Sequence, residues 1–483
     1  MNYRMIGYLL GIILMIEAAL MLLPTVVSVI YGESVLPFII TIGILLAVSV
    51  PIVAFKPKNT SIYTKDGFVC VAAAWILLSA FGALPFVLSG VIPNYIDALF
   101  ETVSGFTTTG ASVMPFVEGH ARGVMFWRSF THWIGGMGVL VFMLAILPSA
   151  GGQAIHLMRA EVPGPQKGKL VPKMRQTALI LYGIYIVLTL IMMAALLLCG
   201  MPLYDSAVNS FATAGTGGFS VLNSSISGYN NPAAEWVIAI FMLLFGINFN
   251  IYFFLLIKRW RDVLRNEELR TYLLIVTLSV TAISINTWQM CRAVGDSIGD
   301  CIRNAFFQVA TIVSTTGYAT ANFDLWPEFS KSILVLLMVT GACAGSTAGG
   351  LKISRILILF KSMLREIRHI LRPRSVSIAK LDGEPLDSRT CHAATGYLAI
   401  YITIVVSTVL LISLDGFDME SNLTATLACF NNIGPGLGAV GPTQNYNGYS
   451  YFSKIILTLN MLLGRLEIMP MMILFSPFAW KKN

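Results

Sequence analysis

The sequence predicts an all-α integral membrane protein built from four tandem repeats, and three observations support this. Of its 483 residues, 56% are hydrophobic and 12% are charged, whereas a soluble domain carries about 25% charge. Ten apolar segments are each near or above the ~20 residues with which a helix crosses a bilayer. Four short glycine-centred stretches also recur between these segments, with glycines 108, 99 and 117 residues apart, as expected for an internal repeat.

The apolar segments are distributed along the whole chain. They lie at about 5–31, 35–55, 67–91, 124–148, 177–200, 233–257, 271–290, 331–371, 393–414 and 451–476. The first is too long for the apolar core of a secretory signal and has no convincing cleavage site after it. We therefore expect it to span the membrane, and we expect a break inside the 331–371 segment.

Each repeat is predicted to contain a span, a short helix, a glycine loop and a second span. The loops are Thr107-Thr108-Thr109-Gly110, Gly215-Thr216-Gly217-Gly218, Ser314-Thr315-Thr316-Gly317 and Asn431-Asn432-Ile433-Gly434. Thirteen residues before the last glycine of each stands a side chain able to cap a helix, namely Asp97, Asp205, Asn304 and Ser421. The predicted units are two N-terminal helices in 1–62 and repeats in 63–172, 173–267, 268–388 and 389–483.

The distribution of basic residues predicts the orientation. With the N-terminus inside, 25 of the 32 lysines and arginines fall in inner segments, six fall outside, and Arg465 lies within a span. This asymmetry favours a cytoplasmic location for both termini and explains the net charge of +8 without a nucleic-acid partner. It places all four glycine loops on the outer side.

Four glycine loops around one axis would form a filter for a monovalent cation. Irregular backbone at membrane depth is tolerated only where it lines a protein-enclosed cavity, and rings of backbone carbonyls can replace the hydration shell of an ion. The candidate ion-binding residues are Thr108, Thr109, Gly110, Thr216, Gly217, Gly218, Thr315, Thr316, Gly317, Asn432, Ile433 and Gly434. In the second loop the thirteen-residue spacing favours Gly218 over Gly217. The alternative is four tight outer turns without an ion.

Acidic residues near the outer ends predict a vestibule that concentrates cations. They are Asp97, Glu101, Asp205, Glu235, Asp300, Asp324, Asp415, Asp418 and Glu420. Several of them could instead be helix caps.

A second constriction is predicted at residues 341–350, where four glycines interrupt an apolar segment. Glycine is unfavourable inside a helix, so we expect an intramembrane loop that acts as a gate. Its candidate residues are Gly341, Ala342, Gly345, Ser346, Thr347, Gly349 and Gly350, with Arg465. Close helix packing through small residues is the alternative.

Arg465 should face the pore or cap carbonyls of the 341–350 loop, since a charge inside a span is usually paired or functional. A snorkelling structural arginine is the alternative. Lys352 and Arg355 follow the loop and are expected to reach the cytoplasmic interface. The 352–391 stretch mixes basic and apolar residues, which predicts an amphipathic helix that lies on the membrane or binds a cytoplasmic subunit.

No enzyme signature is convincing. The Gly215–Gly218 stretch lacks the strand and helix of a dinucleotide site, no Walker sequence occurs, and the five histidines form no metal-ligand pattern. The seven cysteines have no metal-ligand spacing either. Cys291 and Cys301 flank one outer loop and could pair.

At these residues the chain resembles the Trk/Ktr/HKT superfamily of potassium transporters, in particular the bacterial TrkH type. The resemblance covers essentially the whole length. Besides the four loops it includes Phe106, Ala111-Ser112, Phe219-Ser220, Tyr318, Pro435-Gly436-Leu437-Gly438, Trp133-Ile134-Gly135-Gly136-Met137-Gly138, Gly345-Ser346-Thr347-Ala348-Gly349-Gly350-Leu351-Lys352 and Gly464-Arg465-Leu466-Glu467.

The resemblance implies a pseudo-fourfold pore in one chain, assembled as a homodimer in the bacterial cytoplasmic membrane. It implies K⁺ as the transported ion, a gate in the third repeat, a positive barrier at Arg465, and a cytoplasmic nucleotide-binding regulatory subunit of the TrkA or KtrA type. In this superfamily, serine at the first filter position accompanies sodium permeability, and Gly110 at that position favours potassium. A sodium-permeable or cation-coupled symporter is the alternative within the fold. A non-conducting membrane scaffold or sensor would not need four loops in register.

Overall fold

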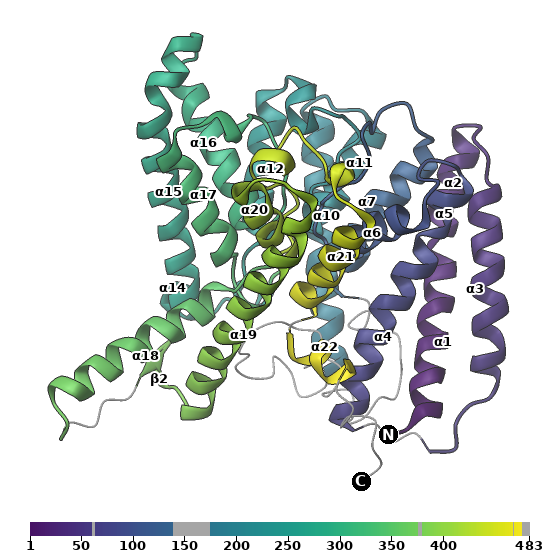
Figure 1. Ribbon diagram of the computed structural model, residues 1–483, viewed down its shortest axis with the longest axis horizontal. Helices are drawn as coiled ribbons and strands as arrows, with labels where there is room; N and C mark the ends of the chain where they lie inside the picture. Colours follow the sequence, from purple (N-terminus) through teal and green to yellow (C-terminus); the bar gives the residue numbers. More distant parts are fainter. Residues whose placement is uncertain (60–62, 139–173, 375–378, 467, 476–483) are drawn as a thin grey trace.

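The computed structural model describes residues 1–59, 63–138, 174–374, 379–466 and 468–475. The chain is an all-α membrane protein in which long helices surround short ones (Figure 1). At the N-terminal end, α1 (Tyr3–Leu20) continues into α2 (Leu22–Ile30), and α1 packs against both α3 (Leu36–Ala54) and α4 (Thr64–Gly82). The two N-terminal spans therefore lie beside the first span of the first repeat.

The rest of the chain repeats one arrangement four times. The first repeat contains α4, α5 (Leu84–Leu88), α6 (Tyr95–Phe106) and α7 (Arg122–Gly136), and the second contains α10 (Met174–Leu198), α11 (Leu203–Ala214), α12 (Pro232–Phe245) and α13 (Phe249–Leu256). The third contains α14 (Trp260–Arg265), α15 (Glu267–Val294), α16 (Ile298–Val313), α17 (Glu328–Thr340) and α18 (Ile353–Leu371). The fourth contains α19 (Ser388–Ile412), α20 (Met419–Phe430), α21 (Tyr451–Arg465) and α22 (Ile468–Phe475).

The short helices α6, α11, α16 and α20 are the pore helices of the four repeats. Each packs between the two spans of its own repeat. In addition, α7 packs on α11, α12 on α16, α17 on α20, and α21 on α6, so that each second span contacts the next pore helix. These contacts close the four repeats into a ring. All four pore helices lie in the half of the molecule opposite the N-terminus (Figure 1).

Not every one of the ten predicted spans is a single straight helix, and the last, 451–476, is divided between α21 and α22. Six described helices are long and apolar enough to cross a membrane. The 233–257 segment is not straight, because α12 and α13 are bent by 90° at the break between them. The 331–371 segment divides into α17, the loop 341–352 and α18, which projects away from the body (Figure 1). The fourth predicted span is described only to Gly138, and the repeat boundary at 172 lies outside the described residues.

The predicted caps of the pore helices are wrong. The observed N-cap residues are Asn94, Pro202, Ser297 and Asp418. Asp97 and Asp205 lie instead in the first helical turn, where a negative charge is favourable near the N-terminus. Asn304 lies inside α16, because this helix has 16 residues and the other three have 12.

Two smaller features complete the fold. Strands β1 (Lys380–Leu381) and β2 (Glu384–Pro385) form an antiparallel hairpin after α18. Cys291 and Cys301 are both free, so the possible disulfide is not formed.

Candidate functional site

The four glycine loops have the same backbone conformation. The second residue after each pore helix is left-handed although it is not glycine: φ is 56° at Thr108, 56° at Thr216, 57° at Thr315 and 55° at Asn432. Two residues later comes a glycine with φ of 79° at Gly110, 73° at Gly218, 86° at Gly317 and 98° at Gly434. The geometry therefore aligns Gly218, and not Gly217, with the other three.

A shared hydrogen bond produces this conformation. The residue before each aligned glycine donates its N–H to the carbonyl five residues earlier, at 2.8 Å in every loop: Thr109 to Ser104, Gly217 to Ala212, Thr316 to Thr311 and Ile433 to Ala428. This is the long bond of a Schellman helix end, which requires a left-handed residue just before the donor. A non-glycine residue in this left-handed conformation costs about 1–2 kcal/mol, and all four loops contain such a residue.

The glycines themselves close a ring. A Cβ added to Gly110 would overlap the carbonyl oxygen of Gly217, one on Gly218 would overlap that of Thr316, and one on Gly317 that of Ile433. A Cβ on Gly434 would lie 2.8 Å from the carbonyl oxygen of Thr109. Each loop thus lies against the next in the order one, two, three, four and back to one. A side chain at any of these positions would therefore force the neighbouring backbone to move.

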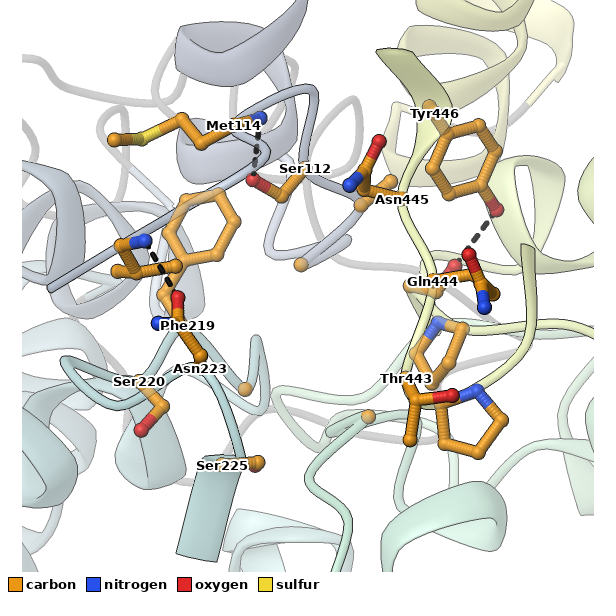
Figure 2. A pocket seen from close by; sticks show the side chains of 18 of the residues that line it. Ser112, Met114, Phe219, Ser220, Asn223, Ser225, Thr443, Gln444, Asn445 and Tyr446 are labelled. Carbon is orange, nitrogen blue, oxygen red and sulfur yellow. Dashed lines mark hydrogen bonds between the residues drawn. The ribbon is translucent and has the colours of Figure 1, made fainter. Parts of the chain in front are cut away.

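The ring borders a cavity of ≈ 340 Å³, part of whose lining Figure 2 shows. All four aligned glycines line it. Its walls include Ser112, Phe219 and Asn223 on one side and Gln444 to Tyr446 on the other. The predicted acidic vestibule is not observed: among the described residues that line this cavity, the charged side chain is Arg128. Glu101 is buried behind the first loop instead.

The pore helices direct their carboxyl ends at this ring, since each loop begins where its helix ends. The carboxyl end of a helix carries partial negative charge from its unpaired carbonyls. Four such ends and the loop carbonyls favour a cation on the axis and disfavour an anion. The arrangement has the chemistry of a cation filter made from backbone oxygen.

The 341–350 segment is a loop, as predicted, and it lies against two of the glycine loops. Gly349 donates its N–H to Thr315 Oγ1 at 2.7 Å, and a Cβ at Gly349 would overlap the Asn431 carbonyl. Gly341, Gly345 and Gly350 have φ of 65°, 71° and 81°. The loop is also tied to the second repeat, where Thr347 Oγ1 donates to the Phe245 carbonyl at 3.2 Å.

Arg465 caps carbonyls of this loop, as we predicted. Its guanidinium donates to the Thr347 carbonyl at 2.6 Å and to the Gly136 carbonyl at 2.8 Å, and it also bonds the Gly135 carbonyl. The side chain is buried. Arg465 therefore joins the third-repeat loop to the end of α7 beneath the glycine ring.

Lys352 and Arg355 do not reach the cytoplasmic interface, and that expectation is wrong. Both are buried. Lys352 Nζ bonds the Ala348 carbonyl, and the Arg355 guanidinium stacks 4.1 Å from the Tyr397 ring centroid. The positive charge of Lys352 is therefore held against the 341–350 loop by the Ala348 carbonyl.

Glu268 is a site residue that sequence reasoning missed. Its Oε1 accepts from the Ala344 N–H at 2.7 Å and from the Ser354 N–H at 3.1 Å, so it ties the 341–352 loop and the start of α18 to α15. Charged groups are rarely this buried without partners, but the partners lie 76 and 86 residues away. No local sequence signal could have identified them.

Replacing Glu268 with alanine should release the 341–352 loop. Two buried N–H groups would lose their acceptor, at about 1–3 kcal/mol each, so we expect basal ion flux to rise and thermal stability to fall. Flux into liposomes and the unfolding temperature measure both effects. E268Q keeps an oxygen acceptor and should recover most of the closed behaviour; equal flux in E268A and the wild type would contradict this role for Glu268.

The fold and the ring together define a class: an all-α, multi-pass membrane protein whose four repeats place backbone loops around one axis. A family model described as "TrkH: Cation transport protein" matches residues 37–482. The chain belongs to this family, which confirms the resemblance found in the sequence.

Comparisons with individual proteins point to the same family. The chain is 35% identical to the Trk system potassium uptake protein TrkH of Salmonella typhimurium, covering 100% of both chains. It is 33% identical to the Trk system potassium uptake protein TrkG of Escherichia coli K12, covering 99% of both. The crystal structure of the potassium transporter TrkH from Vibrio parahaemolyticus matches with a TM-score of 0.88 at 30% identity, covering 100% of both chains.

Proposed function

We propose that this protein takes up K⁺ through a gated pore in the bacterial cytoplasmic membrane. The observation that carries the proposal is the closed ring of four glycine loops that borders an outer cavity. Backbone carbonyls of these loops coordinate the ion, and K⁺ is the transported species rather than a resident cofactor. The names of the relatives, which describe potassium uptake, point the same way.

The candidate filter residues have distinct roles in this proposal. The carbonyl oxygens of the residues before the aligned glycines (Thr109, Gly217, Thr316 and Ile433) lie against the aligned glycine of a neighbouring loop. The left-handed residues Thr108, Thr216, Thr315 and Asn432 fix the conformation. A non-conducting scaffold would have no use for this fourfold conformation.

The lower constriction regulates flux. The loop 341–350 and Arg465 lie beneath the ring and close the pathway, and Arg465 adds a fixed positive charge that opposes a cation. Opening is controlled by a cytoplasmic nucleotide-binding subunit of the TrkA or KtrA type. The protein works as a homodimer with both termini in the cytoplasm, the orientation that the distribution of basic residues favours.

Flux through the purified protein tests the proposal. Protein in liposomes should admit K⁺ or Rb⁺ down a gradient, and the regulatory subunit should change the rate. The alternative is a sodium-permeable or cation-coupled symporter of the same fold. K⁺ currents that do not depend on Na⁺ or H⁺ gradients support the pore, whereas a strict requirement for a second ion supports the symporter.

Thr315 provides a test of the link between ring and gate. Replacing it with valine removes the acceptor of the Gly349 N–H and should weaken the closed loop by about 1–3 kcal/mol. We expect T315V to raise flux without the regulatory subunit. T311V is the matched control, because Thr311 lies in the pore helix that precedes Thr315 and its hydroxyl has no hydrogen-bond partner among the described residues. A similar effect of both substitutions would argue against the link.

A further inference from the structure

A buried ion pair joins the first two glycine loops. The Glu101 carboxylate on α6 and the Arg128 guanidinium on α7 lie 2.7 Å apart (Oε1 to Nε), with 0% and 3% of their side chains exposed. Neither residue belongs to a glycine loop. A paired charge this deeply buried needs a reason, because replacing such pairs by apolar groups often costs nothing in stability.

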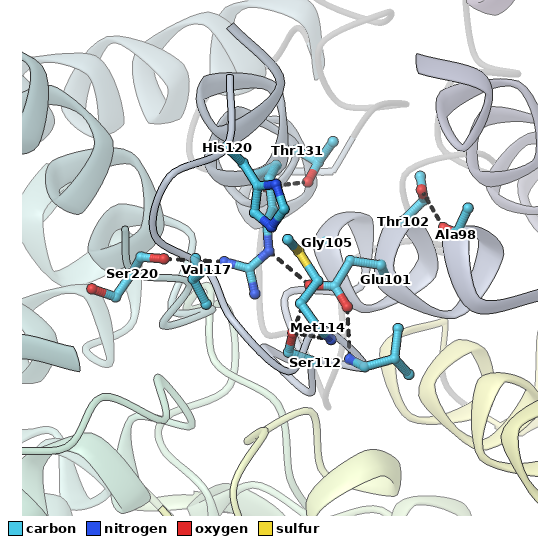
Figure 3. Close-up of polar contacts among 12 residues, drawn as sticks. Ala98, Glu101, Thr102, Gly105, Ser112, Met114, Val117, His120, Thr131 and Ser220 are labelled. Carbon is cyan, nitrogen blue, oxygen red and sulfur yellow. Dashed lines mark hydrogen bonds and ion pairs between the residues drawn. The ribbon is translucent and has the colours of Figure 1, made fainter. Parts of the chain in front are cut away.

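The pair is tethered on both sides. Glu101 accepts from Ser112 Oγ and from the Val113 N–H, both at 2.9 Å, and so holds the backbone that follows Gly110 (Figure 3). Arg128 donates to the Ser220 carbonyl at 3.2 Å, just after Gly218. Its guanidinium also lies 3.5 Å from the centroid of the Phe219 ring. The pair therefore connects the chain leaving the first glycine to the chain leaving the second.

The third and fourth repeats make the first of these tethers without charge. Nine residues before the aligned glycine, the third repeat has Gln308 where the first has Glu101. The Gln308 amide bonds Thr320 and Ala321, three and four residues after Gly317. In the fourth repeat, Thr424 Oγ1 accepts from the Leu437 N–H at 2.9 Å, three residues after Gly434. A neutral side chain is thus sufficient to hold one loop.

We therefore attribute the charged pair of the first repeat to the second tether, the hydrogen bond from Arg128 to the Ser220 carbonyl. A guanidinium can bond a carboxylate and a carbonyl at once through separate N–H groups, which a neutral amide or an ammonium on a flexible stem does less well. Arg128 also lines the outer cavity together with Gly110 and Gly218.

We propose that Glu101 and Arg128 are a positioning pair that sets the spacing between the first and second glycine loops and thereby the discrimination between K⁺ and smaller cations. The inference rests on the proposed filter function. The pair does not touch the ion. It fixes two of the four loops whose carbonyls do.

The test is R128K with R303K as its matched control. Lysine keeps the charge, but its flexible ammonium makes the two bonds of Arg128 less well than a guanidinium does. Arg303 forms a similar Nε to carboxylate pair with Glu235 at 2.8 Å, on pore helix α16 but away from its loop. We expect the K⁺/Na⁺ permeability ratio to fall about tenfold in R128K and to stay within about twofold of the wild type in R303K.

The outcomes separate this inference from the proposed function. A wild-type protein without K⁺ flux defeats the proposed function itself. A wild type that selects K⁺, with an unchanged ratio in R128K, overturns the positioning pair alone, as does an equal fall in both variants. If R128K does not fold, S112A removes one tether of Glu101 and should lower the ratio in the same direction; an unchanged ratio in folded S112A overturns the inference.

Discussion

Replacing Gly110 with serine is expected to remove most of the discrimination between K⁺ and Na⁺. The added Cβ would overlap the Gly217 carbonyl oxygen, and φ at this position is +79°. An L-residue at such a φ costs about 1–2 kcal/mol even without a clash. The first and second loops must therefore separate, and carbonyls from both would move off the axis. We expect the K⁺/Na⁺ permeability ratio in liposomes to fall at least about tenfold.

G183S is the matched control for this substitution. Gly183 lies in α10, and a Cβ there would have no heavy atom of another residue within 4 Å. The same glycine-to-serine change should therefore leave selectivity intact. A wild-type permeability ratio in folded G110S protein would show that the first loop does not select the ion.

Replacing Arg465 with alanine is expected to open the lower constriction. The substitution removes a buried positive charge and the bonds that hold Thr347 and Gly136 together. Each 1.4 kcal/mol removed from the barrier is worth about tenfold in rate, and one charge within ~4 Å of an ion is worth more than that at protein dielectric constants. K⁺ flux without the regulatory subunit should therefore rise about tenfold or more.

R465K separates charge from geometry in this experiment. Lysine keeps the positive charge but cannot reproduce the planar fork that bonds carbonyls from two elements. We expect R465K to give flux between wild type and R465A. Flux in R465A at or below the wild-type rate, with the protein folded, would mean that Arg465 is a structural residue and not a barrier.

The glycine ring could be predicted because its signal is local and repeated. A Schellman helix end followed by a glycine needs particular residues within a few positions, and the sequence repeats them at Gly110, Gly218, Gly317 and Gly434. The loop at 341–350 could be predicted for a similar reason, since four glycines in ten residues exclude a stable helix.

The helix starts could not be placed by one fixed spacing. The pore helix of the third repeat is four residues longer than the others, and its true cap, Ser297, forms a capping box with Asp300. Asn304 matched the spacing but lies inside the helix. A capping box is itself a sequence signal, so this start could have been found from the residues around Ser297.

Long-range polar partners could not be predicted at all. Glu268, Lys352 and Arg128 carry charges that look like those of surface loops when the sequence alone is read. Glu268 bonds backbone 76 and 86 residues away, and Arg128 bonds the Ser220 carbonyl 92 residues away. Lys352 is held by its own loop, through the Ala348 carbonyl. One sequence does not reveal which distant segments meet, so the roles of Glu268 and Arg128 could not be predicted.

The most direct test of the central claim is the anomalous scattering of Rb⁺ or Tl⁺ bound to crystals of the full-length protein. We predict a strong peak on the axis of the four glycine loops, within coordination distance of carbonyls from all four. Ordered ions elsewhere in the protein, with none among Gly110, Gly218, Gly317 and Gly434, would contradict the account.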